Sequence, residues 1–447
     1  MRIKQIAING LFGMFNHIVP LNLTEHITIV YGINGIGKTM LFKILDSFFN
    51  SNFSKLVSFP FDRLMIEFEN NDTISFFNSE KDFFIEYQSK GNKSIFDLGQ
   101  LKSAEHIKDE KVIRQLRRLL PMPVSQYSDN ELIFHQTDEI LTVEEIIDRY
   151  SEMLPSELKQ EDSIKNKTEL DRIIKSTNLY FIQTQRLIAF NYLKRKQQYG
   201  MERDYNLNKV ETVKKYSEEL SEIIQERHRE YAKRSEEYEL SLGKRLRSKE
   251  VKTYSDLEEL KKENKVLEAK RNELKSVGLF EEIKEDYSNI PDTIDEIERA
   301  VLSVNIQDMK NKLKIFDELY ERLKKFLDIL NHKRFSYKKI SIHPKKGFVF
   351  ENDYGKPLQV TELSSGEQHE IVLFYELLFK VTENSLVLID EPEISLHVVW
   401  QKEFLTDLED IVKIRHFDIL LATHSPSIIN GNWDLTVELN KDKNDEK

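Results

Sequence analysis

The first residues able to do chemistry form the segment GINGIGKT, from Gly32 to Thr39. The spacing G-x-x-x-x-G-K-[ST] is typical of a phosphate-binding loop, in which backbone N–H groups surround an anion and the lysine reaches the β- and γ-phosphates. The threonine hydroxyl is a suitable ligand for Mg²⁺. The apolar run before the loop and the residues after it predict a strand and a helix. The residues expected to contact a nucleoside triphosphate are Gly32, Asn34, Gly35, Gly37, Lys38 and Thr39.

An acidic pair follows a second apolar run in LVLIDEPE. The run predicts a buried strand that ends at Asp390 and Glu391, and ligands of open α/β sheets bind at this end of the strands. We expect Asp390 to hold Mg²⁺, directly or through water, and Glu391 to orient and deprotonate the attacking water. An acidic pair after a strand is commonly only a polar strand end, but the phosphate loop favours the catalytic interpretation.

Two further motifs allow a structural and a functional interpretation. In TELSSGEQHE, Ser364 to Gly366 stand at a predicted helix start, which fits either an N-cap or a second anion site. In ATHSPS, His424 follows an apolar strand, where a neutral imidazole could hydrogen-bond a γ-phosphate oxygen or the attacking water. A lone histidine is more often structural, but together with the other motifs it favours a catalytic role.

The middle of the chain differs from both ends, because Lys and Glu dominate it and glycine is nearly absent. The simplest prediction is two long helices folded into an antiparallel arm, with an ordinary helical bundle as the alternative. One seam steps by three and four residues. It contains Leu257, Leu260, Asn264, Leu267, Arg271 and Leu274. A second apolar stripe contains Phe316, Leu319, Leu323, Phe326 and Leu330.

The predicted fold class is α/β, with a P-loop head split by this helical insertion. We expect an N-terminal lobe of the head over residues 1–95, with an antiparallel β layer, and a helical lobe over 96–202. The arm is expected over 203–334, the C-terminal lobe of the head over 335–436 and a disordered tail over 437–447.

Composition excludes several classes of protein. The 447 residues include no cysteine, so disulfides and thiolate metal sites are excluded. We find no signal peptide and no run near the ~18 apolar residues of a spanning helix, so we expect a cytoplasmic protein without a membrane partner. The net charge of −11 disfavours wholesale coating of DNA, although local basic patches leave nucleic-acid binding open.

The four motifs, with the insertion between the first and the other three, resemble the ABC-type ATPases of the SMC and RecF-like group. The resemblance covers about residues 1–95 and 335–436, and LSSGE matches the ABC signature with Ser364 at its serine and Gly366 at its last glycine. The segment DEPEISLH…WQ and the short arm look most like the stand-alone bacterial ATPases of overcoming-lysogenization-defect and anti-phage systems, such as the PtuA ATPase of Septu or the AriA ATPase of PARIS.

The resemblance implies ATP and Mg²⁺ as cofactors and a homodimer of heads, in which the signature of one protomer caps the nucleotide of another. It also implies a metal-sensing glutamine, either Gln183 or Gln185. The sequence departs from the transporter pattern at His397, where an aspartate is usual, and at Glu393, which replaces a small polar residue.

Two functions follow from the resemblance. The first is the sensor and regulatory subunit of a bacterial anti-phage defence system, which controls a separate effector nuclease or toxin, such as an HNH or Toprim-type nuclease encoded nearby. The second is a DNA-repair or recombination ATPase that binds DNA. Acidity and the short arm favour the first. We expect no Toprim domain in this chain, because only about twenty residues follow His424.

Overall fold

The computed structural model describes residues 1–79, 83–98, 110–120, 124–128, 131–134, 139–143, 146, 167–182, 188–190, 209–248, 256–280, 290–291, 293–394 and 396–439. The chain divides into two compact units. Unit 1 comprises Met1–Gln185, Phe190–Lys209 and Val381–Lys447, and unit 2 comprises Arg186–Ala189 and Val210–Lys380.

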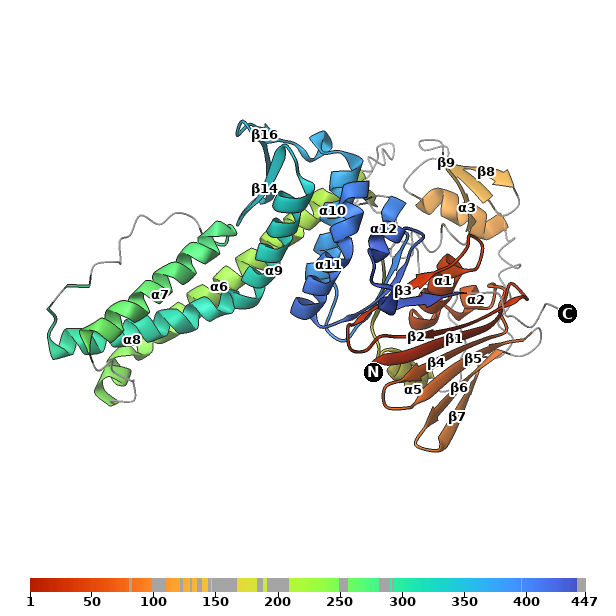
Figure 1. The fold of residues 1–447 in the computed structure, drawn as a ribbon, viewed down its shortest axis with the longest axis horizontal. Helices are drawn as coiled ribbons and strands as arrows, with labels where there is room; N and C mark the ends of the chain where they lie inside the picture. Colours follow the sequence, from red (N-terminus) through yellow and green to blue (C-terminus); the bar gives the residue numbers. More distant parts are fainter. Residues whose placement is uncertain are drawn as a thin grey trace, which may run out of the picture. The chain divides into compact units, whose positions relative to one another are not determined.

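Unit 1 contains a six-stranded antiparallel sheet in the order β2-β1-β4-β5-β6-β7, drawn in red to orange in Figure 1. Its strands are β1 (Ile3–Leu11), β2 (Phe15–Pro20), β4 (Arg63–Phe68), β5 (Thr73–Asn78), β6 (Phe83–Ser89) and β7 (Asn92–Asp97). Buried and exposed residues alternate along β2 and β4, as one covered face requires. The expected antiparallel β layer is therefore confirmed.

A second sheet of unit 1 is parallel throughout and has the order β11-β17-β18-β3-β19. Its strands are β3 (Ile27–Tyr31), β11 (Leu179–Ile182), β17 (Leu386–Asp390), β18 (Asp418–Ala422) and β19 (Thr436–Glu438). Every residue of β17 and β18 is buried, which is typical of strands covered on both faces. The helices beside these sheets are α1 (Lys38–Phe49), α2 (Phe53–Leu56), α11 (Val398–Arg415) and α12 (Pro426–Ile429).

One hydrophobic core joins the two sheets through α1. The core includes Ile6 of β1, Phe42 of α1 and Leu388 of β17, each of which is fully buried. The ring of Phe42 also contacts that of Phe181 in β11, with centroids 6.0 Å apart. Because α1 begins directly after the phosphate loop, this core fixes the loop relative to both sheets.

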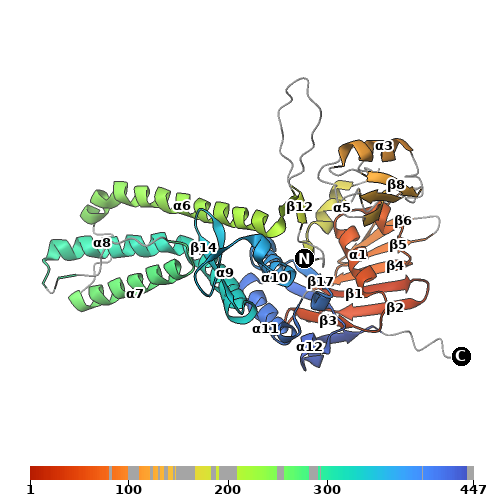
Figure 2. The same cartoon turned by 90° about the horizontal axis from the view of Figure 1, so that it is seen from above.

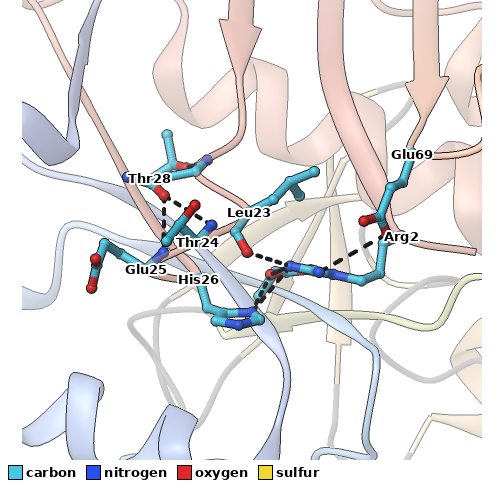
Figure 3. Close-up of polar contacts among 9 residues, drawn as sticks. Arg2, Leu23, Thr24, Glu25, His26, Thr28 and Glu69 are labelled. Atoms are coloured by element: carbon cyan, nitrogen blue, oxygen red, sulfur yellow. Dashed lines mark hydrogen bonds and ion pairs between the residues drawn. The ribbon is translucent and has the colours of Figure 1, made fainter.

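A polar cluster around Arg2 joins the start of β1 to the residues that precede β3 (Figure 3). Arg2 donates through Nε and Nη2 to the two carboxylate oxygens of Asp418, at 3.1 and 2.8 Å. Its Nη2 also donates to the Leu23 carbonyl, and His26 Nδ1 lies 2.9 Å from Asp418 Oδ1. These contacts give both oxygens of the buried Asp418 carboxylate a partner, so the cluster is best explained as structural.

Unit 2 contains three helices that lie side by side in Figure 2, rather than the two expected. They are α6 (Thr212–Ser248), α7 (Leu257–Ser276) and α8 (Glu296–Leu313). The predicted seam is buried at Leu260, Leu267 and Leu274 of α7. The third helix arises because the chain starts again at a capping box, in which Asp295 and Glu298 bond each other's backbone N–H groups.

The second predicted stripe is also buried. It lies mostly on α9 (Asp317–Asp328), where the Phe326 ring stacks on Phe348 of β15, with centroids 5.5 Å apart. The small sheet β14-β15-β16 comprises β14 (Lys338–His343), β15 (Gly347–Asn352) and β16 (Pro357–Leu358), and α10 follows it (Ser365–Tyr375). These elements belong to unit 2 together with the arm. The predicted boundary between the arm and the C-terminal lobe was residue 334, whereas unit 2 ends at Lys380.

The predicted helical lobe over 96–202 needs a correction. Its described part contains the helices α3 (Glu110–Leu119) and α5 (Lys167–Ile174), but also an antiparallel sheet of β8 (Val124–Ser128), β9 (Glu131–Phe134) and β10 (Glu139–Thr142). Strands of four or five residues carry too few alternations for the sequence pattern to reveal them. The short strands β12 (Ile188–Phe190) and β13 (Lys209–Glu211) pair where the chain passes between the units.

The fold is α/β, and the sequence of the unit that carries the phosphate loop is interrupted by a helical insertion, as predicted. Among the described residues, no helix combines the length and the apolar character needed to cross a bilayer.

Candidate nucleotide-binding and hydrolysis site

The phosphate loop leaves β3 at Gly32 and enters α1 at Lys38. Gly35 and Gly37 have φ values of +82° and +101°, in the left-handed region that favours glycine. A Cβ at Gly37 would lie 2.3 Å from Leu11 Cδ2, so this position also allows close packing on the β1–β2 hairpin. Gly37 caps α1 without a side-chain hydrogen bond, so the first N–H groups of the helix point toward the expected anion.

Lys38 is buried to 5% exposure, which is unusual for a lysine. Its Nζ donates to the carbonyls of Gly32 and Ile33, at 3.0 and 3.4 Å. Burial lowers its pKa, and the negative charges of Glu391 and Asp390 oppose that effect. The ammonium therefore lies close to the carboxylates that follow β17, as the interpretation of these residues as one site requires.

Asp390 ends β17 and is 9% exposed. It is hydrogen-bonded to Thr39, whereas its Oδ1 is buried with no partner among the described residues. Burial raises the pKa of Asp390, and the nearby charges of Glu391 and Glu393 raise it further. A buried carboxylate oxygen without a partner is costly and indicates a ligand that the chain alone does not supply.

These groups fit a magnesium ion. Mg²⁺ commonly binds one or two protein oxygens and completes its shell with phosphates and water. The Thr39 hydroxyl and the unpaired Oδ1 of Asp390 supply such a pair. No group of three or more His, Cys, Asp or Glu side chains suited to a metal occurs in the described part of the chain. The ion would therefore depend on the nucleotide for further ligands.

Glu391 has a φ of +45°, which is strained for a residue with a Cβ. Its backbone N–H donates to the Ala422 carbonyl at 2.9 Å, which holds the strained turn against β18. The same strand leads to His424, whose Nε2 lies 3.7 Å from Glu391 Oε1. Both side chains are one-third exposed, so water can reach the carboxylate that is expected to act as the base.

Three residues near the site had no chemical role in the sequence analysis. Glu393 accepts the backbone N–H of His424 at 2.7 Å through Oε1. The imidazole of His17, which is buried, contacts the Ile36 carbonyl of the phosphate loop at 2.9 Å. The Phe12 ring, at the tip of the β1–β2 hairpin, lies 3.4 Å from the position of a Cβ at Gly37. Only Glu393 had a signal in the sequence, because it is a third acidic residue two positions after Glu391.

The signature residues Ser364 and Gly366 belong to unit 2, whereas the groups described above belong to unit 1. Ser364 is the N-cap of α10, and it forms a capping box with Glu367. The Glu367 carboxylate accepts the Ser364 backbone N–H at 2.7 Å and a hydrogen bond from Lys338 Nζ at 2.8 Å. The N-cap interpretation is therefore correct, and Ser364 is nevertheless exposed.

Two further predictions concern His397 and the metal-sensing glutamine. His397 caps the N-terminus of α11 by accepting the Val399 N–H, at 3.4 Å. Gln183 and Gln185, the alternative metal-sensing residues, lie outside the described residues.

The chain belongs to the AAA ATPase domain family, whose model matches residues 1–429. Protein ea59 of Escherichia phage lambda is 45% identical over 69 residues, which are 15% of this chain and 13% of that protein. Among solved structures, the Smc head domain with an extended coiled coil, bound to the C-terminal domain of ScpA from Pyrococcus furiosus, aligns with 98% of this chain and 94% of its own at 13% identity and a TM-score of 0.33. An SmcHead bound to the C-winged helix domain of ScpA aligns with 97% of this chain and 92% of its own at 10% identity and a TM-score of 0.36.

Proposed function

We propose that the protein binds ATP with Mg²⁺ at the phosphate loop and hydrolyses it. The observation that carries this proposal is the buried charge at the ends of β3 and β17. Lys38 and Asp390 both lose solvation there, and Asp390 Oδ1 has no partner in the described part of the chain. Triphosphate and its ion would satisfy both groups. Membership of the AAA ATPase domain family supports the same activity.

Each residue then has a distinct role. The loop amides and Lys38 bind the β- and γ-phosphates, and Thr39 and Asp390 hold the ion, which neutralises charge on the phosphates when bound. Glu391 orients a water molecule and takes its proton, while His424 donates a hydrogen bond to the γ-phosphate or to that water. Positive φ at Glu391 aims its carboxylate out of the strand direction and into the space beside His424.

The site becomes complete, in this proposal, when Ser364 and Gly366 of a second copy meet the γ-phosphate. Ser364 is exposed at the N-terminus of α10, where helix N–H groups favour an anion. One copy therefore offers a nucleotide site and a signature surface. In a head-to-head homodimer, the signature surface of each copy meets the nucleotide site of the other.

The mixing of two inactive variants tests this composite site. Ser364→Arg should keep ATP binding but lose hydrolysis, because the phosphate loop is unchanged and the bulky side chain blocks the interface. Lys38→Ala should lose ATP binding. In a mixed dimer one site carries both defects and the other carries neither, so ATPase activity should return on mixing. Full activity of Ser364→Arg as an isolated monomer would overturn the composite site.

At the cellular level, we propose that hydrolysis controls a separate effector, an HNH or Toprim-type nuclease or a toxin, in an anti-phage defence system. The DEPEISLH…WQ segment, the short arm and the net charge of −11 support this role. The alternative is a repair or recombination ATPase that binds DNA. Co-purification with a nuclease encoded by the adjacent gene would favour defence, and adjacent recombination genes would favour repair.

A further inference from the structure

Glu393 connects the two loops that carry the proposed base and the proposed histidine. It lies three residues after the end of β17, in a short turn from Pro392 to Ile394. Its Oε1 accepts the backbone N–H of His424, which follows β18, at 2.7 Å. A charge-assisted bond of this length is among the stronger hydrogen bonds of proteins. Glu393 therefore fixes the backbone of His424, and the His424 ring extends from this fixed point toward Glu391.

A second contact joins the same two loops from the side of α11. The Gln401 amide donates to the Leu396 carbonyl at 3.2 Å, and its oxygen accepts the Ser425 hydroxyl at 2.8 Å. Gln401 is buried, so this bridge is formed inside the unit. Glu393 and Gln401 thus hold the loop of Glu391 and the loop of His424 at adjacent points, one of them directly at the histidine backbone.

The carboxylate of Glu393 lies close to the charged groups of the nucleotide site. Its negative charge acts on Lys38 and on Asp390. Its Oε2 is buried and has no partner among the described residues, whereas Oε1 holds the His424 N–H. The residue that anchors the His424 loop therefore lies beside the groups proposed to bind the nucleotide.

We propose that Glu393 is a positioning residue for hydrolysis, which holds His424 against Glu391 through the His424 backbone. This inference rests on the proposed ATPase function. This role requires that the side chain at position 393 present a hydrogen-bond acceptor to the His424 N–H, as Oε1 does. Displacement of a catalytic group by about 1 Å can cost on the order of 100-fold in rate, so loss of one anchor among several should cost less.

A double-mutant cycle measures the proposed connection. Glu393→Ala should lower kcat on the order of tenfold, with ATP affinity and KM unchanged. Glu393→Gln keeps an acceptor for the His424 N–H and should restore kcat to within about threefold of the wild type. In a His424→Ala background, Glu393→Ala should have less than about a twofold further effect, because the group that it positions is absent. Glu25→Ala removes an exposed carboxylate at the opposite end of β3 and serves as the matched control.

Hydrogen exchange supplies a readout that does not depend on activity. A peptide that spans Thr423 to Ser427 should exchange faster in Glu393→Ala than in the wild type or in Glu393→Gln, because the His424 amide loses its acceptor. Unchanged exchange, additive effects in the cycle, or loss of ATP binding in Glu393→Ala would each overturn the positioning role. An inactive wild type, or a fully active Glu391→Gln, would instead refute the proposed ATPase mechanism, and the exchange result would still show whether Glu393 holds the His424 loop.

Discussion

Two buried aspartates of unit 1, Asp72 and Asp390, have opposite surroundings. Asp72 lies in the turn between β4 and β5 and is 5% exposed. Its Oδ2 accepts hydrogen bonds from Asn70 Nδ2 at 2.7 Å and from the Tyr87 hydroxyl at 2.8 Å. Burial alone would raise the pKa of Asp72, but bonds from Ser89, Tyr87 and Asn70 outweigh it and leave the pKa below its ordinary value. The chain itself satisfies this charge.

Asp390 is almost as buried, but the chain satisfies only part of its carboxylate. Thr39 is its hydrogen-bonding partner, Oδ1 has none in the described part, and burial raises the pKa. The acidic neighbours Glu391 and Glu393 make the charge still less favourable. The difference separates a carboxylate that the fold satisfies from one that we propose to bind a cation, although both occur beside apolar strands in the sequence.

The largest expected effect concerns hydrolysis. Glu391→Gln keeps the size of the side chain but removes the base, so kcat should fall on the order of 100-fold while ATP still binds. Asp72→Asn makes the same chemical change in the other acidic region and should leave kcat within about twofold, since its carboxylate lies in the antiparallel sheet away from Lys38. Phosphate release by the two purified variants is the measurement. Equal losses in both would show that general destabilisation, and not the base, explains the effect.

The sequence predicts this contrast only in part. The motifs around Lys38, Asp390 and His424 predict a site because each has a fixed spacing beside a strand or helix. The third helix of the arm and the sheet β8 to β10 were missed, since short strands and a helix that restarts after a break have weak periodicity. The roles of Asp72 and Glu393 depend on partners far away in the sequence or across a loop. No local pattern records whether a buried carboxylate is satisfied.

The next effect is on stability. Asp72→Ala removes the acceptor of Asn70 and Tyr87, and it should lower the free energy of unfolding by about 2 kcal/mol. Both tryptophans of the chain, Trp400 and Trp433, lie in unit 1, so urea unfolding followed by their fluorescence reports on this unit. Glu25→Ala, with an exposed carboxylate in the same unit, should change the midpoint little.

The same comparison predicts a pH dependence. The pKa of Asp72 is lower in the folded state than its ordinary value of 3.8, so its stabilisation is fully present above 3.8. As the pH falls through the lowered folded pKa, the carboxylate is protonated in both states and the stabilisation is lost. The deficit of Asp72→Ala relative to the wild type should therefore be full at about pH 7 and smaller at about pH 3. A deficit that is constant over this range would mean that packing, and not charge, stabilises Asp72.

The smallest effect has the opposite sign. Asp390→Asn removes a buried charge whose pKa is raised, so without nucleotide the variant should be more stable than the wild type by about 1 kcal/mol. Added ATP and Mg²⁺ should raise the unfolding midpoint of the wild type by mass action but should raise that of the variant much less, because a ligand of the ion is gone. The two curves, followed by tryptophan fluorescence, would then cross as ATP and Mg²⁺ are titrated. If the variant is less stable than the wild type without ligand, the Asp390 carboxylate stabilises the fold, as the Asp72 carboxylate does.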